Sequence, residues 1–386
     1  MRTEKTWDDR RLKDERLAQL QRAMREQGIG ALYLTEGVNV RYILNLHIPG
    51  GAAFVPAVGV PIAFVRSLDE GYVRLAHSDV RPHLYRADAS DPEADEKALR
   101  WADELSALME EYGSPGEMLG VDSMDPIAFL ALNRRAFRLQ NAEKVLELAK
   151  TVKTQDEVAI YREMGKIYGS IMRYLQNELE PGVSEQEMLR RVYSQVVLMG
   201  AEGLLQINVC SGENMNPWRR WPTERRFLDG DLVGMDLHIY GPGGYIYDSA
   251  RTYLCGEKAS DTYRDLYRRA HDYNNGVIQL LRPGLSIADF KNSLPAVPEE
   301  FHPVLYSFHI AHSNGLTPGE YPSIMKAHKA IDDVFRVNQV LSVDCVFARE
   351  GDDAAVKLEE LVLLTEHGAV KMADMPYEEK LLGSSA

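Results

Sequence analysis

The sequence has few cysteines and no long apolar run. Only three cysteines occur among 386 residues, and none forms a Cys-x-x-Cys pair, which excludes a disulfide framework and favours a reducing compartment. No apolar run approaches the roughly 20 residues that a transmembrane helix needs, and the charged N-terminal residues do not resemble a signal peptide. We therefore expect a cytoplasmic protein without a membrane partner.

Basic residues are also outnumbered by acidic ones. The 44 Lys and Arg residues against 58 Asp and Glu residues give a net charge of -14, which argues against nucleic acid as a partner. The hydrophobic content of 45% is typical of a globular protein, and 386 residues exceed what one hydrophobic core usually serves. We expect two domains.

The N-terminal part alternates between helical and strand-like patterns. Helices are predicted over 8–28, over 96–112 and from 126, and strands over 31–34, 52–58, 61–65 and 118–121. This order indicates a small α/β domain, to which we assign residues 1–148.

The pattern changes at Thr154 and Glu157, whose spacing is that of a capping box and predicts the start of a long helix that runs through Leu175. Further helices are predicted from Ser184 and over 260–281, with strand hairpins between and after them. Helices interleaved with antiparallel hairpins favour an α+β fold for the second domain, residues 149–386.

Acidic and imidazole side chains gather on one predicted hairpin. Residues 230–254 read as two strands joined by the turn 241–244, and alternation along the first strand puts Asp236 and His238 on the same face. The returning strand can bring Asp248 opposite them.

Two more carboxylates occur in later apolar strands. Asp344 lies in the predicted strand 340–347 and Glu359 in 355–364. One such acid alone is usually exposed or paired with a cation, but burial of several is costly unless they are paired or bound to metal. Taken together, the five side chains indicate a cation site.

These motifs resemble the creatinase, aminopeptidase P and methionine aminopeptidase superfamily, over nearly the whole chain. The first hairpin, the segment from His312 to Pro322 and the strand from Lys357 to Gly368 carry the resemblance. It implies a creatinase-type N-terminal domain, a C-terminal pita-bread domain and a homodimer. It also implies two divalent ions, Mn, Fe or Zn, held by five ligands: Asp236, Asp248, His312, Asp344 and Glu359. Asp344 stands where the family has Glu, and this shorter side chain could weaken one ion site.

Two histidines that peptidases of this superfamily use are replaced, one by Trp218 and one by Gly319. Asn216-Pro217-Trp218 is similar to the metal-dependent dimethylsulfoniopropionate lyases of the same fold, whose second hairpin carboxylate falls at His238. By that resemblance Trp218 and Tyr245 are candidates for substrate binding. Glu320 and His238 are candidates for proton transfer.

Four arginines follow Trp218 closely and could bind a substrate carboxylate, although most are expected to be solvated or paired: Arg219, Arg220, Arg225 and Arg226.

Three hypotheses remain. The first is a metal-dependent lyase or hydrolase of a small carboxylated molecule, including one with a sulfonium or ammonium group. The second is a divergent Xaa-Pro aminopeptidase or prolidase. The third is a catalytically silent binding protein that keeps the fold.

Overall fold

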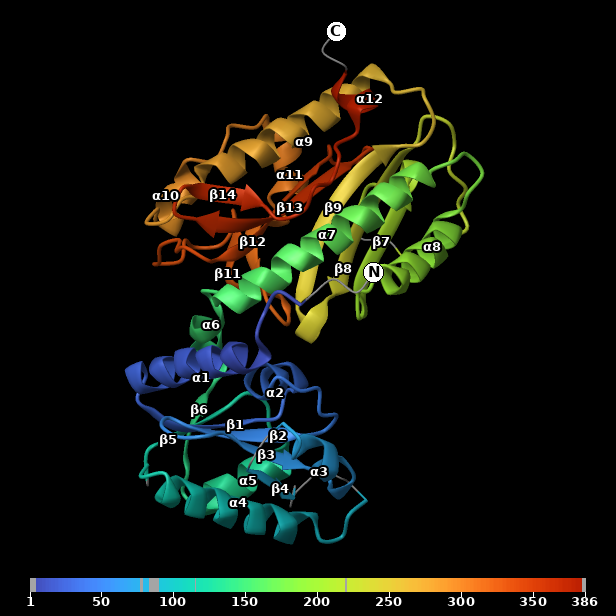
Figure 1. Cartoon of the computed structure of the whole chain (residues 1–386). Helices are drawn as coiled ribbons and strands as arrows, with labels where there is room; N and C mark the ends of the chain where they lie inside the picture. The colour runs from blue at the N-terminus through green and yellow to red at the C-terminus, as the bar shows by residue number, and fades with distance from the viewer. Residues whose placement is uncertain (1–4, 77–78, 83–89, 115, 219–220, 384–386) are drawn as a thin grey trace. The chain divides into compact units, whose positions relative to one another are not determined.

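The computed structural model describes residues 5–383 except 77–78, 83–89, 115 and 219–220 (Figure 1). The chain divides into two compact units. One is Asp8–Lys150, and the other is Thr151–Ala386, with Trp7 grouped with the latter. The domain ranges 1–148 and 149–386 stay a prediction.

The unit Asp8–Lys150 is built on a six-stranded sheet in the order β4-β3-β2-β1-β5-β6. The strands are β1 (Ile29–Leu34), β2 (Ala52–Pro56), β3 (Ile62–Val65), β4 (Val80–Pro82), β5 (Met118–Val121) and β6 (Arg138–Asn141). The helices are α1 (Asp9–Glu26), α2 (Gly37–Leu44), α3 (Ser67–Val73), α4 (Ala94–Glu111), α5 (Pro126–Arg134) and α6 (Glu143–Lys150). The predicted α/β arrangement is confirmed.

Local sequence explains how this unit begins. The Asp8 side chain caps α1 by accepting hydrogen bonds from two backbone amides of its first turn, and the buried residues Leu12, Leu20 and Met24 form its apolar face. The central strand β1 is buried along its whole length because β2 and β5 flank it. On one face of the sheet, the Tyr33 ring packs edge-on against Trp101 of α4 at 5.1 Å.

The unit Thr151–Ala386 contains an eight-stranded sheet in the order β11-β10-β12-β13-β9-β8-β7, with β14 paired to β13. The strands are β7 (Gly203–Ser211), β8 (Leu232–Tyr240), β9 (Ile246–Leu254), β10 (His309–Asn314), β11 (Pro318–Met325), β12 (Val340–Phe347), β13 (Val356–Thr365) and β14 (Gly368–Lys371). The helices are α7 (Gln155–Asn177), α8 (Glu185–Leu198), α9 (Asp261–Leu280), α10 (Ile287–Asn292), α11 (His302–Leu305) and α12 (Glu379–Leu382). Short 3-10 turns occupy Gly212–Asn214, Pro242–Gly244 and Glu299–Phe301.

The start of α7 matches the prediction from the sequence. The Thr154 hydroxyl accepts a hydrogen bond from the Glu157 amide at 3.2 Å, and the Glu157 carboxylate accepts one from the Thr154 amide at 2.6 Å. This capping box satisfies two amides that a helix N-terminus would otherwise leave without partners.

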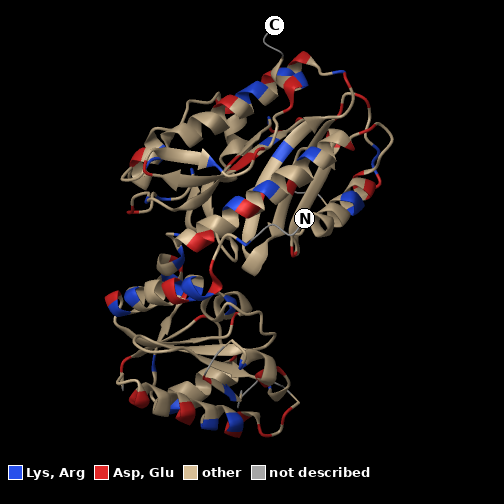
Figure 2. Ribbon diagram, in the orientation of Figure 1, with Lys and Arg blue, Asp and Glu red and all other residues tan. Residues whose placement is uncertain are grey.

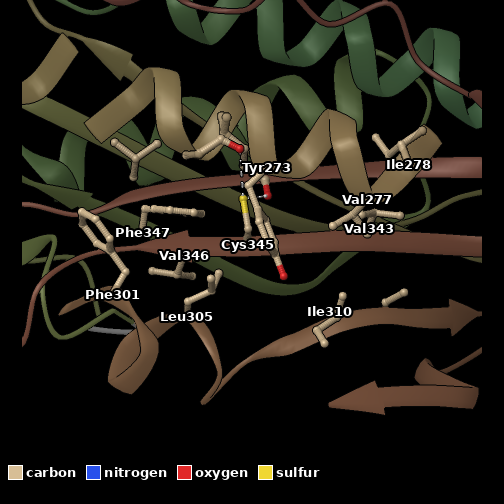
Figure 3. Close-up of a cluster of buried hydrophobic side chains, with 14 of the residues drawn as sticks. Tyr273, Val277, Ile278, Phe301, Leu305, Ile310, Val343, Cys345, Val346 and Phe347 are labelled. Atoms are coloured by element: carbon tan, nitrogen blue, oxygen red, sulfur yellow. Dashed lines mark hydrogen bonds between the residues drawn. The ribbon is translucent and has the colours of Figure 1, made fainter. Parts of the chain in front are cut away.

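Helices α7 and α9 cover one face of this sheet. Tyr168 of α7 stacks on Tyr247 of β9, with ring centroids 4.7 Å apart. Figure 3 shows Tyr273 and Val277 of α9 packed against β12, where Cys345 faces the helix. Burial of an aliphatic side chain such as Val277 contributes about 1.5–3 kcal/mol. Because side chains alternate along a strand, the residues next to these in sequence project from the opposite face.

Charged side chains of both signs run along α1, α4 and α9 (Figure 2). Within the described part of the chain, none of the helices combines the length and hydropathy needed to span a bilayer.

Candidate metal centre

The β8–β9 hairpin brings together the first three candidate side chains. Its register puts His238 directly opposite Asp248, as the sequence predicted. His238 Nε2 lies 2.9 Å from Asp248 Oδ1 and 3.4 Å from Asp236 Oδ1. All three residues are buried, on the sheet face opposite α7. The hairpin therefore supplies two carboxylates and one imidazole to a single point.

Three further strands supply the rest of the cluster. Asp344 of β12 lies opposite Glu359 of β13, which in turn pairs with Ala250 of β9. On β10, His312 Nε2 is 3.6 Å from Asp248 Oδ2 and 3.5 Å from Glu359 Oε1. The small Ala250 side chain stands between the flanking acids, and so it leaves room for their oxygens to converge.

Two groups of donors within the described residues have spacings that suit a metal ion. Asp236, His238 and Asp248 form one, and Asp248, His312 and Glu359 form the other. In each group, one donor atom per residue lies within 4.8 Å of the other two. Asp248 belongs to both groups.

The carboxylate oxygens support this interpretation. Five of them are buried without a hydrogen bond of regular geometry from a described residue, although a histidine or lysine nitrogen lies within 3.5 Å of all but Asp344 Oδ1: Asp236 Oδ1, Asp248 Oδ1, Asp344 Oδ1, Glu359 Oε1 and Glu359 Oε2. Buried carboxylates are costly unless a cation or hydrogen-bond donors compensate them. Oxygen donors with one or two imidazoles suit Mn²⁺, Fe²⁺ or Zn²⁺, so the residues present fit a divalent ion.

Lys357 is the one member of the cluster to which the sequence analysis gave no role. Its ammonium Nζ lies 2.8 Å from Asp236 Oδ2, 3.1 Å from Glu359 Oε2 and 3.4 Å from Asp344 Oδ2. Lys357 precedes Glu359 by two residues, so alternation along β13 puts both on one face. That spacing was the signal in the sequence that could have revealed it.

The charges shift one another's protonation. Burial raises the pKa of Asp344 to about 7, against the opposing effect of Lys357. Burial would also raise the pKa of Glu359, but Lys357 and His312 outweigh it and lower that pKa to about 2. For His238, burial favours the neutral form, yet Asp248 and Asp236 raise its pKa to about 10. The metal-free cluster therefore holds mixed charges that compensate one another.

Trp218 stands beside the centre. Its side chain is buried, and the Lys357 ammonium lies 6.0 Å from its ring centroid. The ring packs directly on Gly234 of β8, where an added Cβ would come within 2.4 Å of it. A glycine at 234 is thus required for the ring to lie at this position.

Tyr245 and Glu320 are engaged elsewhere in the same unit. The Tyr245 hydroxyl donates to Glu157 of α7 at 2.5 Å, and the residue is fully buried. The Glu320 carboxylate accepts hydrogen bonds from the amides of Leu316 and Thr317, and it pairs with buried Lys153 at 3.2 Å. These contacts tie Glu320 to the turn that joins β10 and β11.

Arg225 pairs with Asp231 and Glu213, and Arg226 donates to the Gly182 carbonyl. Arg219 and Arg220 lie outside the described residues.

Comparisons with known proteins agree with this architecture. Residues 159–366 match metallopeptidase family M24, and residues 16–158 match the creatinase/prolidase N-terminal domain. The chain therefore belongs to metallopeptidase family M24, within the pita-bread superfamily, and it has a creatinase-type N-terminal domain. Family membership supports a metal-dependent enzyme.

Individual relatives are distant but match along nearly their whole length. The chain is 23% identical to dimethylsulfoniopropionate lyase DddP of Roseovarius nubinhibens, over 97% of this chain and 89% of the relative. It is 26% identical to the probable dipeptidase PepE of Mycobacterium tuberculosis, over 94% and 95%. The solved Xaa-Pro dipeptidase from Bacillus anthracis superposes with a TM-score of 0.80 at 20% identity, over 95% and 99% of the two chains. At this identity the structural likeness establishes the fold alone.

Proposed function

We propose that the protein is a metal-dependent lyase or hydrolase of a small carboxylated molecule that carries a sulfonium or ammonium group. One observation carries the proposal: buried metal-donor side chains converge on one point, and the aromatic ring of Trp218 lies beside them. The centre would belong to a catalytic domain of residues 149–386 that follows an N-terminal domain of residues 1–148. From the resemblance alone, we also propose a cytoplasmic homodimer.

Asp248, His312 and Glu359 are the proposed core of the ligand set, because their donor atoms gather within 4.8 Å. The resemblance adds Asp236 and Asp344 and implies two ions of the Mn, Fe or Zn kind. A divalent ion bound here would polarise a substrate oxygen or lower the pKa of a bound water. The buried protein wall around it would strengthen that effect by excluding bulk water.

The proposed lyase reaction is an elimination. A base removes the proton on the carbon next to the carboxylate, and the bond to the onium group breaks to leave an unsaturated acid and a neutral thioether or amine. Of the two candidate bases, we assign this role to His238, because Glu320 is bound by Lys153 and by an amide of the turn before β11. His238 accepts a proton only as the neutral imidazole, so the role requires a divalent ion on Asp248 that offsets the carboxylates raising its pKa. The face of Trp218 would attract the onium cation.

Peptide hydrolysis is less well supported by this chain. Gly319, which stands where peptidases of the superfamily have a histidine, adopts a φ of 72°, in the left-handed region that favours glycine. Trp218 stands in place of the other histidine. Loss of one positioned oxyanion donor usually reduces the rate by roughly 10²–10³, so loss of two should leave little peptidase activity.

A direct comparison of substrates tests the proposal. Metal-loaded protein is assayed with dimethylsulfoniopropionate, with its trimethylammonium counterpart and with a panel of Xaa-Pro dipeptides, and Asp248→Ala serves as the inactive control. We expect release of thioether or amine that the control lacks, and no proline release above background. Proline release at ordinary enzyme rates would support the peptidase hypothesis instead. No activity on any substrate, in a protein that binds no metal, would support the silent binding protein.

A further inference from the structure

The Lys357 ammonium lies among three carboxylates that a two-ion centre would be expected to use as metal ligands. Its ammonium contacts one oxygen each of Asp236 on β8, Asp344 on β12 and Glu359 on β13, at 2.8, 3.4 and 3.1 Å. These three acids come from three different strands, and all of them belong to the predicted ligand set. A compact positive charge surrounded by three carboxylate oxygens satisfies the same electrostatic demand as a metal ion.

A metal ion could bind these three oxygens only if the Lys357 ammonium moved away from them. A metal ion binds carboxylate oxygens at about 2.0–2.2 Å, so an ion on the same three oxygens would overlap the ammonium. The Lys357 side chain is buried, with 4% of its surface exposed, and the ring of Trp218 lies 6.0 Å from its charge. Moving the ammonium away would therefore bury an uncompensated charge or displace the tryptophan.

Of the two donor groups, the one that contains His312 and Glu359 is the site left for an ion, because the proposed function reserves His238 of the other group for proton transfer. Glu359 turns Oε2 to the lysine and Oε1 to His312, at 3.5 Å. His312 also lies 3.6 Å from Asp248 Oδ2, which completes one group of two carboxylates and an imidazole. Asp236, by contrast, is contacted by Lys357 on one oxygen and by His238 on the other.

Asp344 lies outside both donor groups that the described residues form. It is one methylene shorter than the glutamate expected there by resemblance, and its Oδ2 faces Lys357.

We propose that the Lys357 ammonium replaces one of the two ions, so that the centre binds a single divalent ion through Asp248, His312 and Glu359. The inference rests on the proposed function insofar as the centre must bind metal. It changes the number of ions and the role of Asp344, which becomes a partner of Lys357 rather than a ligand.

The number of ions bound tests this directly. The full chain is stripped with a chelator and titrated with Mn²⁺, and the stoichiometry is measured by calorimetry and by elemental analysis after gel filtration. We expect one ion per chain for the unmodified protein and two for Lys357→Met, whose thioether leaves the three oxygens to metal. Lys357→Arg keeps the charge and is expected to bind one ion.

A matched control is Lys371→Met. Lys371 pairs with Glu360 at 3.1 Å, outside the centre, and its replacement should leave the count at one. Electron paramagnetic resonance gives an independent readout. A single Mn²⁺ should give the simple six-line signal in the unmodified protein, whereas Lys357→Met should show the exchange-coupled spectrum of a pair. Circular dichroism in the presence of Mn²⁺ checks that each variant is folded.

Two tightly bound ions in the unmodified protein would overturn the inference while leaving the proposed function intact. A count of one in folded Lys357→Met would also overturn it, because Lys357 would then not determine the number. No bound ion in any form would refute both the inference and the metal-dependent function. The count for the unmodified protein and for Lys357→Arg decides the question if Lys357→Met does not fold.

Discussion

Gly234→Ala should disturb the centre without touching any charged group. A Cβ at position 234 would lie 2.4 and 2.5 Å from two atoms of the Trp218 ring and 2.9 Å from the Met215 side chain. Ordinary contacts of this kind are 3.4 Å or longer, so the ring must move by about 1 Å. The backbone φ of Gly234 lies outside the left-handed region. The expected loss of stability is therefore caused by the steric clash and not by backbone strain.

Overpacking of this size typically costs about 1–3 kcal/mol. For a unit of about 240 residues each kcal/mol lowers the melting temperature by about 2–4 °C, so we expect a decrease of about 2–12 °C. If the Trp218 face binds an onium group, a displaced ring also loses roughly 0.5–2 kcal/mol of binding, which raises KM about 2- to 30-fold.

The assay is thermal unfolding together with steady-state kinetics, and metal content is measured in parallel. Gly203→Ala is the matched control: it is also a strand glycine, and among the described residues its Cβ would come within 4 Å of Tyr240 alone, at 3.9 Å. The control should be neutral or slightly stabilising, by up to about 1 kcal/mol. A Gly234→Ala variant as stable as the control, with unchanged KM, would refute the placement of Trp218 beside the centre.

Three further predictions concern the charged groups. His238→Gln should keep its metal but lose about 10²–10⁴ in rate, and loss of the metal itself would instead make His238 a ligand. Glu320→Gln should destabilise the protein by about 3–5 kcal/mol, because this is the usual effect of removing one charge from a buried ion pair. Its metal content should be unchanged. A variant of unchanged stability but reduced rate would restore Glu320 as a candidate base. Burial lowers the pKa of His312, but contacts with Glu359 and Asp248 outweigh burial and raise that pKa above its usual 6.5. Protons should therefore compete with the metal ion for the His312 imidazole already above pH 6.5. Affinity should then fall by up to about tenfold per pH unit as the pH decreases from 8 to 6, and a pH-independent affinity would exclude His312 as a ligand.

The first hairpin could be predicted from the sequence because its information is local. Alternation fixes the shared face of Asp236 and His238, and a turn of glycines and proline between two apolar strands fixes the returning partner. The register of His238 opposite Asp248 confirms that reasoning. The capping box at Thr154 was predictable for the same reason, since it depends on residues only three positions apart.

Long-range features were harder to derive. The pairing of Glu359 with Ala250 joins strands that are more than a hundred residues apart, and no local pattern specifies it. The reach of Lys357 to Asp236 depends on a flexible side chain that crosses between strands. Glu320 fits a motif by spacing, yet in β11 its carboxylate is bound by Lys153 and by a backbone amide of the preceding turn. Spacing alone does not fix the direction of such a side chain.

Metal content of the purified full chain tests the central claim most directly. Elemental analysis after incubation with Mn²⁺, Fe²⁺ or Zn²⁺ should find tightly bound divalent metal in the unmodified protein. Asp248→Ala should lose it, because Asp248 belongs to both groups of donors. An unmodified protein that binds none of these ions, or an Asp248→Ala variant that binds them equally well, would contradict the account.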